Sequence, residues 1–216
     1  MKKLGKIFLF IFLITAFHPI AAQKRVLCVG DSITYGSKTG GYRKYLWDWK
    51  FAIGNYIFVG PYTSPGQPHF GTPGATTDFI KQWIKMAIQY YDPDIILLMA
   101  GVNDIAYGKS ANYVTKNLYD IIDIIFKTSH KKPFVFIHEI TPVASSYHQK
   151  IINIINANLV SKIAIPFLMK GDYCIPVAND PSVTVQDLID GIHPNETGYM
   201  KLAVSWFYWL YAACKY

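Results

Sequence analysis

Two polar motifs near opposite ends of the chain contain residue types that can perform nucleophilic catalysis. Ser32 follows Gly30 and Asp31 at the end of an apolar segment, and His193 lies three residues after Asp190 in a polar segment. A serine hydroxyl attacks poorly unless a base accepts its proton, and a histidine held by a carboxylate can be that base. On a tight turn Asp190 can reach Nδ1–H of His193 and leave Nε2 free for Ser32. Taken alone, Ser32 would be interpreted as a turn residue or a helix cap. The motif that contains Asp190 and His193 would be interpreted as a turn with a helix cap at Asn195. The presence of both motifs favours a nucleophile, a base and an acid that orients the base.

Acyl transfer also requires hydrogen-bond donors for the negative oxygen that develops in the transition state. Three donors are available: the backbone N–H groups of Ser32 and Gly74, and the side-chain amide of Asn103. Gly74 precedes a predicted helix, and the first N–H groups of a helix have no partner within it. Turn geometry also explains Gly74, and a turn that ties two loops also explains Asn103, so both alternatives stay open.

Short apolar segments alternate with segments of helical periodicity along the chain, and no repeat or linker interrupts this order. The order predicts an α/β fold in which helices cover both faces of a parallel sheet. The expected strands are residues 25–29, 56–59, 94–100, 134–138 and 165–169, and the expected helices are residues 77–91, 113–127, 146–163 and 196–213.

Topology gives an independent reason to place a site near Ser32 and Asn103. In an open parallel sheet, ligands bind beyond the carboxyl ends of the strands where the winding reverses. With a strand order of 2-1-3-4-5, that point lies between the first and third strands. The residues that follow these strands are 30–32 and 101–104, so a hydroxyl and a carboxamide are expected to meet there.

The first 22 residues have the composition of a secretory signal peptide. Lys2, Lys3 and Lys6 precede an apolar stretch, residues 7–17, that is too short to span a bilayer, and small residues follow up to Ala22. A buried first strand or helix would not explain the three lysines. We therefore expect cleavage after Ala22, export to the periplasm or the cell exterior, and one catalytic domain over residues 23–216. No cysteine follows the apolar stretch, so a stable membrane anchor is not expected.

Charge and cysteine content restrict the partners. Removing the three lysines lowers the formal charge from +7 to +4, and no basic stripe with interleaved aromatics remains, which argues against nucleic-acid binding. Cys28 lies in an apolar strand and is expected in the core. Cys174 and Cys214 can pair or remain free. No cysteine or histidine spacing indicates a metal site, so neither a metal nor a cofactor is expected.

The motifs together resemble the four sequence blocks of the SGNH (GDSL-type) hydrolases, in that family's order and over residues 25–213. The blocks are Gly30-Asp31-Ser32-Ile33, an isolated Gly74, Gly101-x-Asn103-Asp104 and Asp190-x-x-His193-Pro194. Several further stretches are similar to the acetyl-xylan esterase-like group, carbohydrate esterase family three: residues 30–36, 41–46, 58–60, 69–74 and 190–199.

The resemblance implies a flavodoxin-like, three-layer α/β/α sandwich with a five-stranded parallel sheet. It implies Ser32 as nucleophile, His193 as base and Asp190 as its orienting acid, with Ser32, Gly74 and Asn103 as the oxyanion hole. In this group an acidic residue commonly follows the histidine that corresponds to His69, whereas Phe70 stands there in this chain.

Residues beside the motifs are candidates for substrate contact. Tyr35, Tyr42 and Phe70 are expected to be exposed aromatic residues that can contact a sugar. Arg43 can anchor a substrate, brace the loops of the site, or lie on the surface at a helix start. Asp31 and Asp104 are expected to brace turns by accepting hydrogen bonds from backbone N–H groups.

The leading hypothesis is an exported serine esterase that removes short acyl groups, above all acetyl, from carbohydrate through an acyl-enzyme on Ser32. One alternative is a lysophospholipase or thioesterase that acts on long acyl chains, although a chain without large insertions offers little material for a long acyl tunnel. A second alternative is a catalytically silent carbohydrate-binding protein, against which the complete set of Ser32, Asn103, Asp190 and His193 argues.

Overall fold

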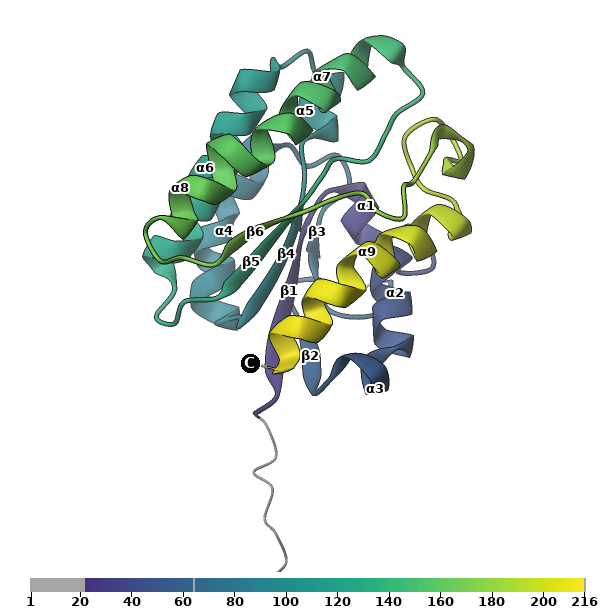
Figure 1. The fold of residues 1–216 in the computed structure, drawn as a ribbon. Helices are drawn as coiled ribbons and strands as arrows, with labels where there is room; N and C mark the ends of the chain where they lie inside the picture. The colour runs from purple at the N-terminus through teal and green to yellow at the C-terminus, as the bar shows by residue number, and fades with distance from the viewer. Residues whose placement is uncertain (1–21, 64, 216) are drawn as a thin grey trace, which may run out of the picture.

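A parallel β-sheet lies at the centre of the computed structural model, which describes residues 22–63 and 65–215 (Figure 1). The predicted signal peptide, apart from Ala22, lies outside the described residues. The strands run in the order β2-β1-β4-β5-β6, and β3 pairs with the end of β1. Their bounds are β1 Lys24–Gly30, β2 Tyr56–Val59, β3 Phe70–Gly71, β4 Ile95–Met99, β5 Phe134–His138 and β6 Cys174–Val177.

The central strands are apolar because helices cover both of their faces. All five residues of β4 are buried, as are the last five of β1, which is the pattern expected of strands inside a parallel sheet. Helices α4, α6, α7 and α8 lie on one side of the sheet, and α2, α3 and α9 lie on the other (Figure 1). The helix bounds are α1 Ser32–Tyr35, α2 Gly41–Asp48, α3 Lys50–Ile53, α4 Thr77–Tyr91, α5 Val102–Ala106, α6 Ala111–Thr128, α7 Ser146–Asn158, α8 Ile165–Leu168 and α9 Glu196–Lys215.

The predicted α/β class and strand order are confirmed. Without the two-residue β3, which the sequence did not predict, the observed path is the expected 2-1-3-4-5 order. The helix expected over residues 77–91 has those bounds; the side chain of Thr76 accepts a hydrogen bond from the N–H of Phe79 at its start, and Asp92 ends it in the left-handed region. Its buried residues Thr77, Ile80, Ile84 and Ile88 recur every three or four positions, with Ala87 next to Ile88, which is the spacing of one helix face.

The fifth strand is a correction. Residues 165–169 were expected to form it, but α7, a short π-helix over Leu159–Ala164 and α8 together form one continuous helical segment. Leu159, Ile163 and Phe167 recur every four residues and are buried, so their period is helical. The true strand, β6, contains Pro176 and pairs only with β5. Proline lacks a backbone N–H and is tolerated on an edge strand, which is why this segment did not have the composition of a strand.

The same helical segment, Ser146–Leu168, is the one described helix that is long and apolar enough to cross a membrane. Its buried side chains, among them Ile152 and Ile155 as well as the three named above, share the face that packs on the core. This is the pattern of an amphipathic helix of a globular core.

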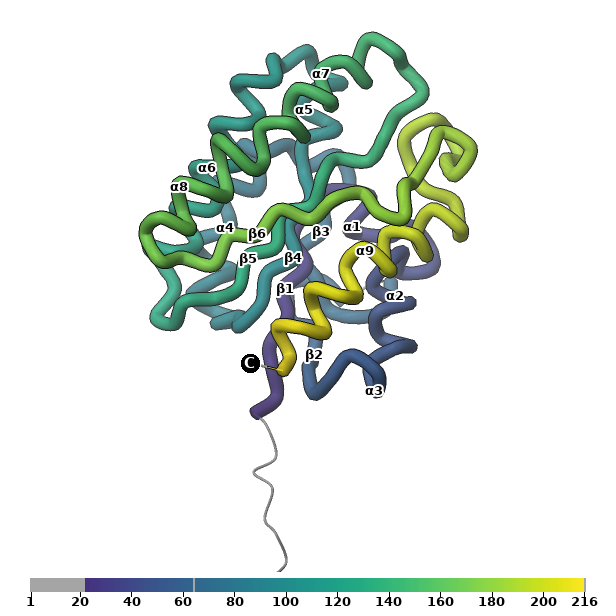
Figure 2. Tube along the Cα trace, in the orientation of Figure 1, coloured from purple at the N-terminus to yellow at the C-terminus, as the bar shows by residue number. Residues whose placement is uncertain are grey.

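The three cysteines are free thiols, so the possible Cys174–Cys214 pair is not formed. Cys28 is fully buried in β1, as expected. The end of α9 lies beside the start of β1 and near α3 (Figure 2), where the backbone of Gly54 approaches the side chain of Cys214.

Candidate active site

Ser32 is held at the carboxyl end of β1 by a tight strand-to-helix turn. The carboxylate of Asp31 accepts a hydrogen bond from the N–H of Ile33 at 2.9 Å, which caps α1. A Cβ atom on Gly30 would lie 2.3 Å from the carbonyl oxygen of Met99, so only glycine allows β1 and β4 to approach each other so closely here. The turn thus fixes the backbone that bears the Ser32 hydroxyl.

The two motifs from opposite ends of the chain meet at one point. Oγ of Ser32 lies 2.8 Å from Nε2 of His193. Nδ1 of the same imidazole lies 2.7 Å from Oδ2 of Asp190. A carboxylate can only accept a hydrogen bond, so Nδ1 carries the proton and Nε2 accepts the hydrogen bond of the Ser32 hydroxyl. This tautomer is the one that a base for Ser32 requires.

Asp190 is held in its charged form. Partial burial raises the pKa of this carboxyl, but hydrogen bonds from the backbone N–H of His193, from its imidazole and from the N–H of Ile192 outweigh that effect and lower the pKa to about 2. The Asp190 side chain is 54% exposed, so its hydrogen bonds, rather than burial, fix its position.

The segment that bears His193 is anchored at both ends. The carbonyl oxygen of His193 accepts the N–H of Ile189 at 2.8 Å, and the N–H of Asn195 donates to the carbonyl oxygen of Asp187 at 2.7 Å. The side chain of Asn195 accepts the N–H of Gly198 in the first turn of α9. The helix-cap role considered for Asn195 is therefore present together with the Ser32–His193 contact. Asp187, which lies outside the four sequence motifs, also forms a 2.7 Å ion pair with Lys201 of α9.

Asn103 lies at the carboxyl end of β4, in α5, and its side chain joins this loop to the one that contains Gly74. Nδ2 of Asn103 donates to the carbonyl oxygen of Ala75 at 2.9 Å. Next to it, the carboxylate of Asp104 accepts hydrogen bonds from the N–H and the hydroxyl of Thr77, at 2.8 and 2.6 Å. The loop-tying role of Asn103 is thus observed, and its amide retains a second N–H. The turn-bracing role predicted for Asp31 and Asp104 is also observed.

Burial changes the pKa of these two bracing acids. Desolvation raises the pKa of Asp31 to about 6, against the opposing effects of the Ile33 N–H and the charge of His193. Desolvation also raises the pKa of Asp104, although its hydrogen bonds with Thr77 oppose the shift. Neither acid contacts Ser32 through a hydrogen bond.

Arg43 is buried and braces the loops of the site. Its guanidinium donates to the backbone carbonyl oxygens of Thr34 and Tyr35 in α1, and to those of Pro65 and Gln67 in the loop after β2. Of the roles considered for Arg43, a surface position is excluded by its full burial. The four carbonyl contacts occupy the guanidinium and leave bracing as the role that the geometry fits.

The aromatic candidates have different positions. Tyr35 is half-buried and, with Gly71, Thr72 and Pro73, lines a hollow of about 600 Å³ beside α1. Tyr42 was considered an exposed sugar contact, but it is fully buried and packs against Trp206; its position on α2 faces the core. Phe70 was also expected to be exposed, but it is only 3% exposed because β3 pairs with β1 inside the sheet; it lines a second, apolar hollow. A third hollow, of about 200 Å³, is lined in part by Asp190, Gly191 and Ile192.

The fold and the site define the class. A parallel α/β sheet places a serine, a histidine and an aspartate in a hydrogen-bonded line at its carboxyl edge, beside an asparagine amide, and this arrangement can turn a hydroxyl into a nucleophile for acyl transfer. Residues 28–201 match the family model of the GDSL-like lipase/acylhydrolase family. The chain belongs to this family.

The chain is also similar to individual proteins in sequence or in fold. A multidomain esterase of Ruminococcus flavefaciens is 31% identical over 220 residues; the match covers 86% of this chain and 28% of that protein, so the chain spans little more than a quarter of the relative's length. Crystal structures of carbohydrate esterase family 3 proteins from Talaromyces cellulolyticus and Clostridium thermocellum both have a TM-score of 0.74. They are 21% and 24% identical, and each match covers 89% of this chain and 99% of the other. These structures are similar in fold.

Proposed function

We propose that this protein is an exported serine esterase that removes acetyl and other short acyl groups from carbohydrate. The observation that carries the mechanism is the line of contacts from Ser32 through His193 to Asp190, with distances of 2.8 and 2.7 Å. The family supports ester hydrolysis. The similarity in fold to carbohydrate esterases supports the substrate class, and the composition of residues 1–22 supports export.

The reaction begins when the ester binds with its carbonyl carbon next to Oγ of Ser32. His193 accepts the hydroxyl proton at Nε2 while Oγ bonds to the carbonyl carbon, and Asp190 stabilises the imidazolium through Nδ1–H. The carbonyl oxygen becomes an oxyanion, for which the N–H groups of Ser32 and Gly74 and the free N–H of the Asn103 amide are the proposed donors.

The intermediate collapses when the bond between the carbonyl carbon and the alcohol oxygen breaks. The proton on Nε2 of His193 passes to the leaving oxygen, which departs as a sugar hydroxyl, and the acyl group remains on Ser32. A water molecule then attacks the acyl carbon and gives its proton to Nε2. Breakage of the bond to Oγ releases the carboxylic acid and returns the proton to Ser32.

The test is release of acetate from acetylated xylan, acetylated glucomannan and sugar peracetates, with lysophospholipid as the alternative substrate and Ser32→Ala as the control. We expect acetate from the carbohydrates and none from the variant, and a steep fall in rate from p-nitrophenyl acetate to p-nitrophenyl octanoate. A rate that rises with acyl length would indicate lipid hydrolysis as the function in place of carbohydrate deacetylation. Near wild-type turnover by Ser32→Ala, with the fold intact, would remove Ser32 from the mechanism.

A further inference from the structure

An exposed aromatic groove lies between the loop after β2 and helix α4, outside the site described above. It has a volume of about 490 Å³, and six of its nine lining residues are aromatic. Trp83 and Tyr90 of α4, which are 40% and 79% exposed, and Tyr62 from the opposite wall contribute rings that remain open to solvent. Large apolar surface of this kind on a folded protein marks an interaction site more often than chance exposure.

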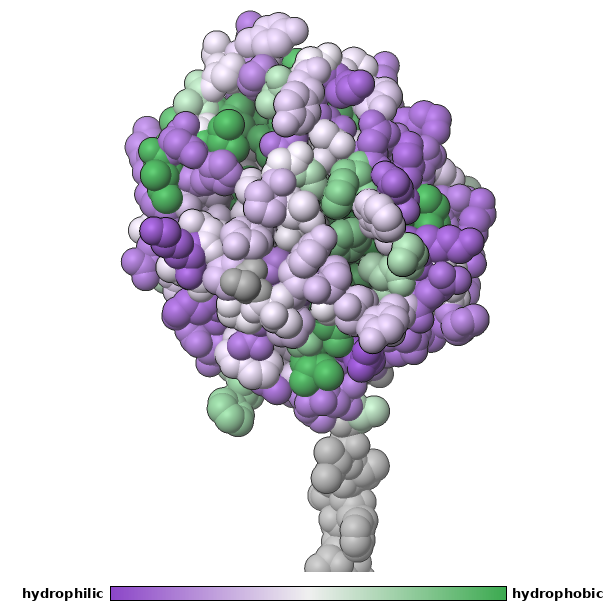
Figure 3. All heavy atoms as spheres, turned by 180° about the vertical axis from the view of Figure 1, so that it is seen from behind, coloured by the Kyte–Doolittle hydropathy of each residue, from purple (hydrophilic) through white to green (hydrophobic). Residues whose placement is uncertain are grey.

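The helical period explains how one helix forms this groove. Phe79, Trp83, Met86 and Tyr90 follow one another at three- or four-residue intervals, so they occupy a single stripe along α4. The sheet-facing side of the same helix carries Ile80, Ile84 and Ile88, which are buried. On the face opposite to that of Figure 1, hydrophobic side chains lie next to side chains of near-neutral hydropathy (Figure 3).

The groove is continuous with the hollow beside α1, the helix that begins at Ser32. The two hollows share Pro61 and Tyr62. Tyr35, three residues after Ser32, contacts the ring of His69 with centroids 5.7 Å apart, and His69 in turn contacts Tyr62 at 5.8 Å. An aromatic path therefore leads from α1 across the loop after β2 to the groove on α4.

The shape and chemistry of the groove distinguish between its possible occupants. An enclosed channel would suit a long acyl chain, whereas this surface is open along α4 and six of its nine lining residues are aromatic. The rings of tyrosine and tryptophan combine a flat apolar body with a polar edge, and the apolar face of a pyranose ring is flat in the same way. Gln82 and Gln89 are exposed on the helix beside Met86, within reach of hydroxyl groups along the rim.

We propose that the groove lined by Tyr62, Trp83 and Tyr90 binds the unreacted sugar units of a polymeric substrate that extends from the Ser32 site. The proposal rests on the proposed carbohydrate esterase function, which it deepens: the enzyme acts on esters within a glycan chain in preference to isolated acetylated sugars. Binding energy gained at a distance from the reacting bond raises the rate only for substrates long enough to reach the groove.

The kinetic test compares a polymeric and a small substrate. Trp83→Ala and Tyr90→Ala are expected to lower kcat/KM on acetylated xylan by about three- to tenfold each, mainly through KM, and to leave kcat/KM on p-nitrophenyl acetate within twofold of wild type. Trp83→Phe, which keeps a ring, is expected to recover most of the loss. Tyr208→Ala on α9, where the tyrosine is 67% exposed, is the matched control and should change neither substrate.

A binding test separates this proposal from the esterase function. In Ser32→Ala, which turns over no ester under the proposed mechanism, calorimetry with unacetylated xylohexaose, mannohexaose and cellohexaose should give binding to at least one, and adding Trp83→Ala should weaken it. Absence of binding to all three, or equal losses on acetylated xylan and p-nitrophenyl acetate, would overturn the groove proposal. Loss on p-nitrophenyl octanoate alone would assign the groove to an acyl chain instead. If the wild-type protein binds the hexaoses but releases no acetate, the groove proposal stands and the proposed esterase function fails.

Discussion

Nε2 of His193 lies 2.8 Å from Oγ of Ser32, although the two residues are 161 positions apart in the chain. In the proposed mechanism the two groups act in the same proton transfer, so removal of either should abolish the same step. Ser32→Ala and His193→Ala are each expected to lower kcat on p-nitrophenyl acetate by at least about 10⁴-fold. The kcat of the double variant is expected to equal that of the less active single variant. Steady-state kinetics on the three proteins, with circular dichroism as the fold control, tests this. Multiplicative losses would show that the two residues act independently.

Replacement of Asp190 by asparagine should impair catalysis with little effect on stability. The amide would keep an oxygen for the backbone N–H groups but would present its NH₂ to Nδ1 of His193, which favours the tautomer with the proton on Nε2. That tautomer cannot accept the proton of Ser32, so kcat should fall by about 10²- to 10⁴-fold. The thermal midpoint should change little because the side chain is half exposed.

The pKa of about 2 for Asp190 adds a pH criterion to this prediction. The carboxylate is charged throughout the range above pH 4, so Asp190→Asn should be less active than wild type at every pH from 5 to 9. Equal activity of the two proteins at any pH in this range would mean that the charged carboxylate is not required there. Profiles of kcat/KM against pH for both proteins provide the measurement.

The proposed oxyanion donors Asn103 and Gly74 should respond differently to alanine. Asn103→Ala removes an N–H donor as well as the bond to Ala75, and kcat should fall by about 10²- to 10³-fold. Gly74→Ala keeps its backbone N–H, and an added Cβ would meet no atom within 4 Å. Its backbone φ of +76° disfavours alanine, so we expect a loss of roughly 1–2 kcal/mol in the free energy of unfolding with activity within about tenfold.

Urea denaturation and kcat on p-nitrophenyl acetate, measured on both variants, separate the two effects. The backbone N–H of residue 74 is retained in Gly74→Ala, so this variant should keep its oxyanion donor. A Gly74→Ala enzyme that is fully stable but as inactive as Asn103→Ala would contradict this assignment. An active Asn103→Ala enzyme would leave Asn103 with only its loop-tying role.

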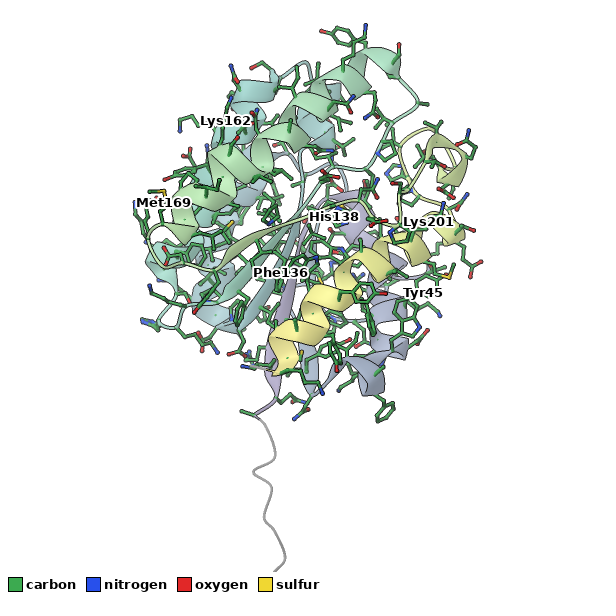
Figure 4. All side chains as sticks on the ribbon, viewed as in Figure 1. Tyr45, Phe136, His138, Lys162, Met169 and Lys201 are labelled. Atoms are coloured by element: carbon green, nitrogen blue, oxygen red, sulfur yellow. The ribbon has the colours of Figure 1, made fainter. Side chains whose placement is uncertain are left out.

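His138 and Asp31 are buried groups that should give opposite pH dependences of stability. His138 is the last residue of β5, and its side chain faces α9 (Figure 4), with Nε2 2.7 Å from Oγ of Ser205; desolvation lowers its pKa to about 4. The unfolded chain, with a histidine pKa near 6.5, therefore binds more protons between about pH 4 and 6.5, and stability falls as the pH drops through this window. Asp31, with a pKa raised to about 6, binds its proton more tightly when folded, so its contribution increases as the pH drops from 6 to 4.

Variants separate the two contributions by sign. Relative to wild type, His138→Gln should gain up to about 3 kcal/mol in the free energy of unfolding as the pH falls from 6.5 to 4. Glutamine does not bind a proton in the unfolded chain, so the loss of stability caused by His138 is absent in the variant. Asp31→Asn should lose stability relative to wild type over pH 6 to 4. Urea denaturation at half-unit pH intervals gives both differences. Parallel curves for wild type and either variant would show that the group concerned does not titrate in this range.

The local patterns of the sequence were enough to predict most of the fold. Helix α4 and the strands β2 and β5 have the predicted bounds, because each is a segment whose apolar period and flanking residues agree. The period was misleading at residues 165–169, where an apolar run belongs to a helix, and at β6, where Pro176 hides an edge strand. A short segment on a sheet edge has only one neighbour, so its own composition indicates little about its pairing.

The residue types and order of the four motifs determined the candidate chemistry: Ser32, Asn103, Asp190 and His193 appear in the sequence with a spacing that can be interpreted without coordinates. Tertiary structure decided how those residues meet, and which neighbours are accessible. It placed Tyr42 in the core and assigned Arg43 to backbone carbonyls, and it opened a groove along α4. Sequence records the chemistry of each side chain, whereas exposure and contact depend on which faces of distant segments pack together.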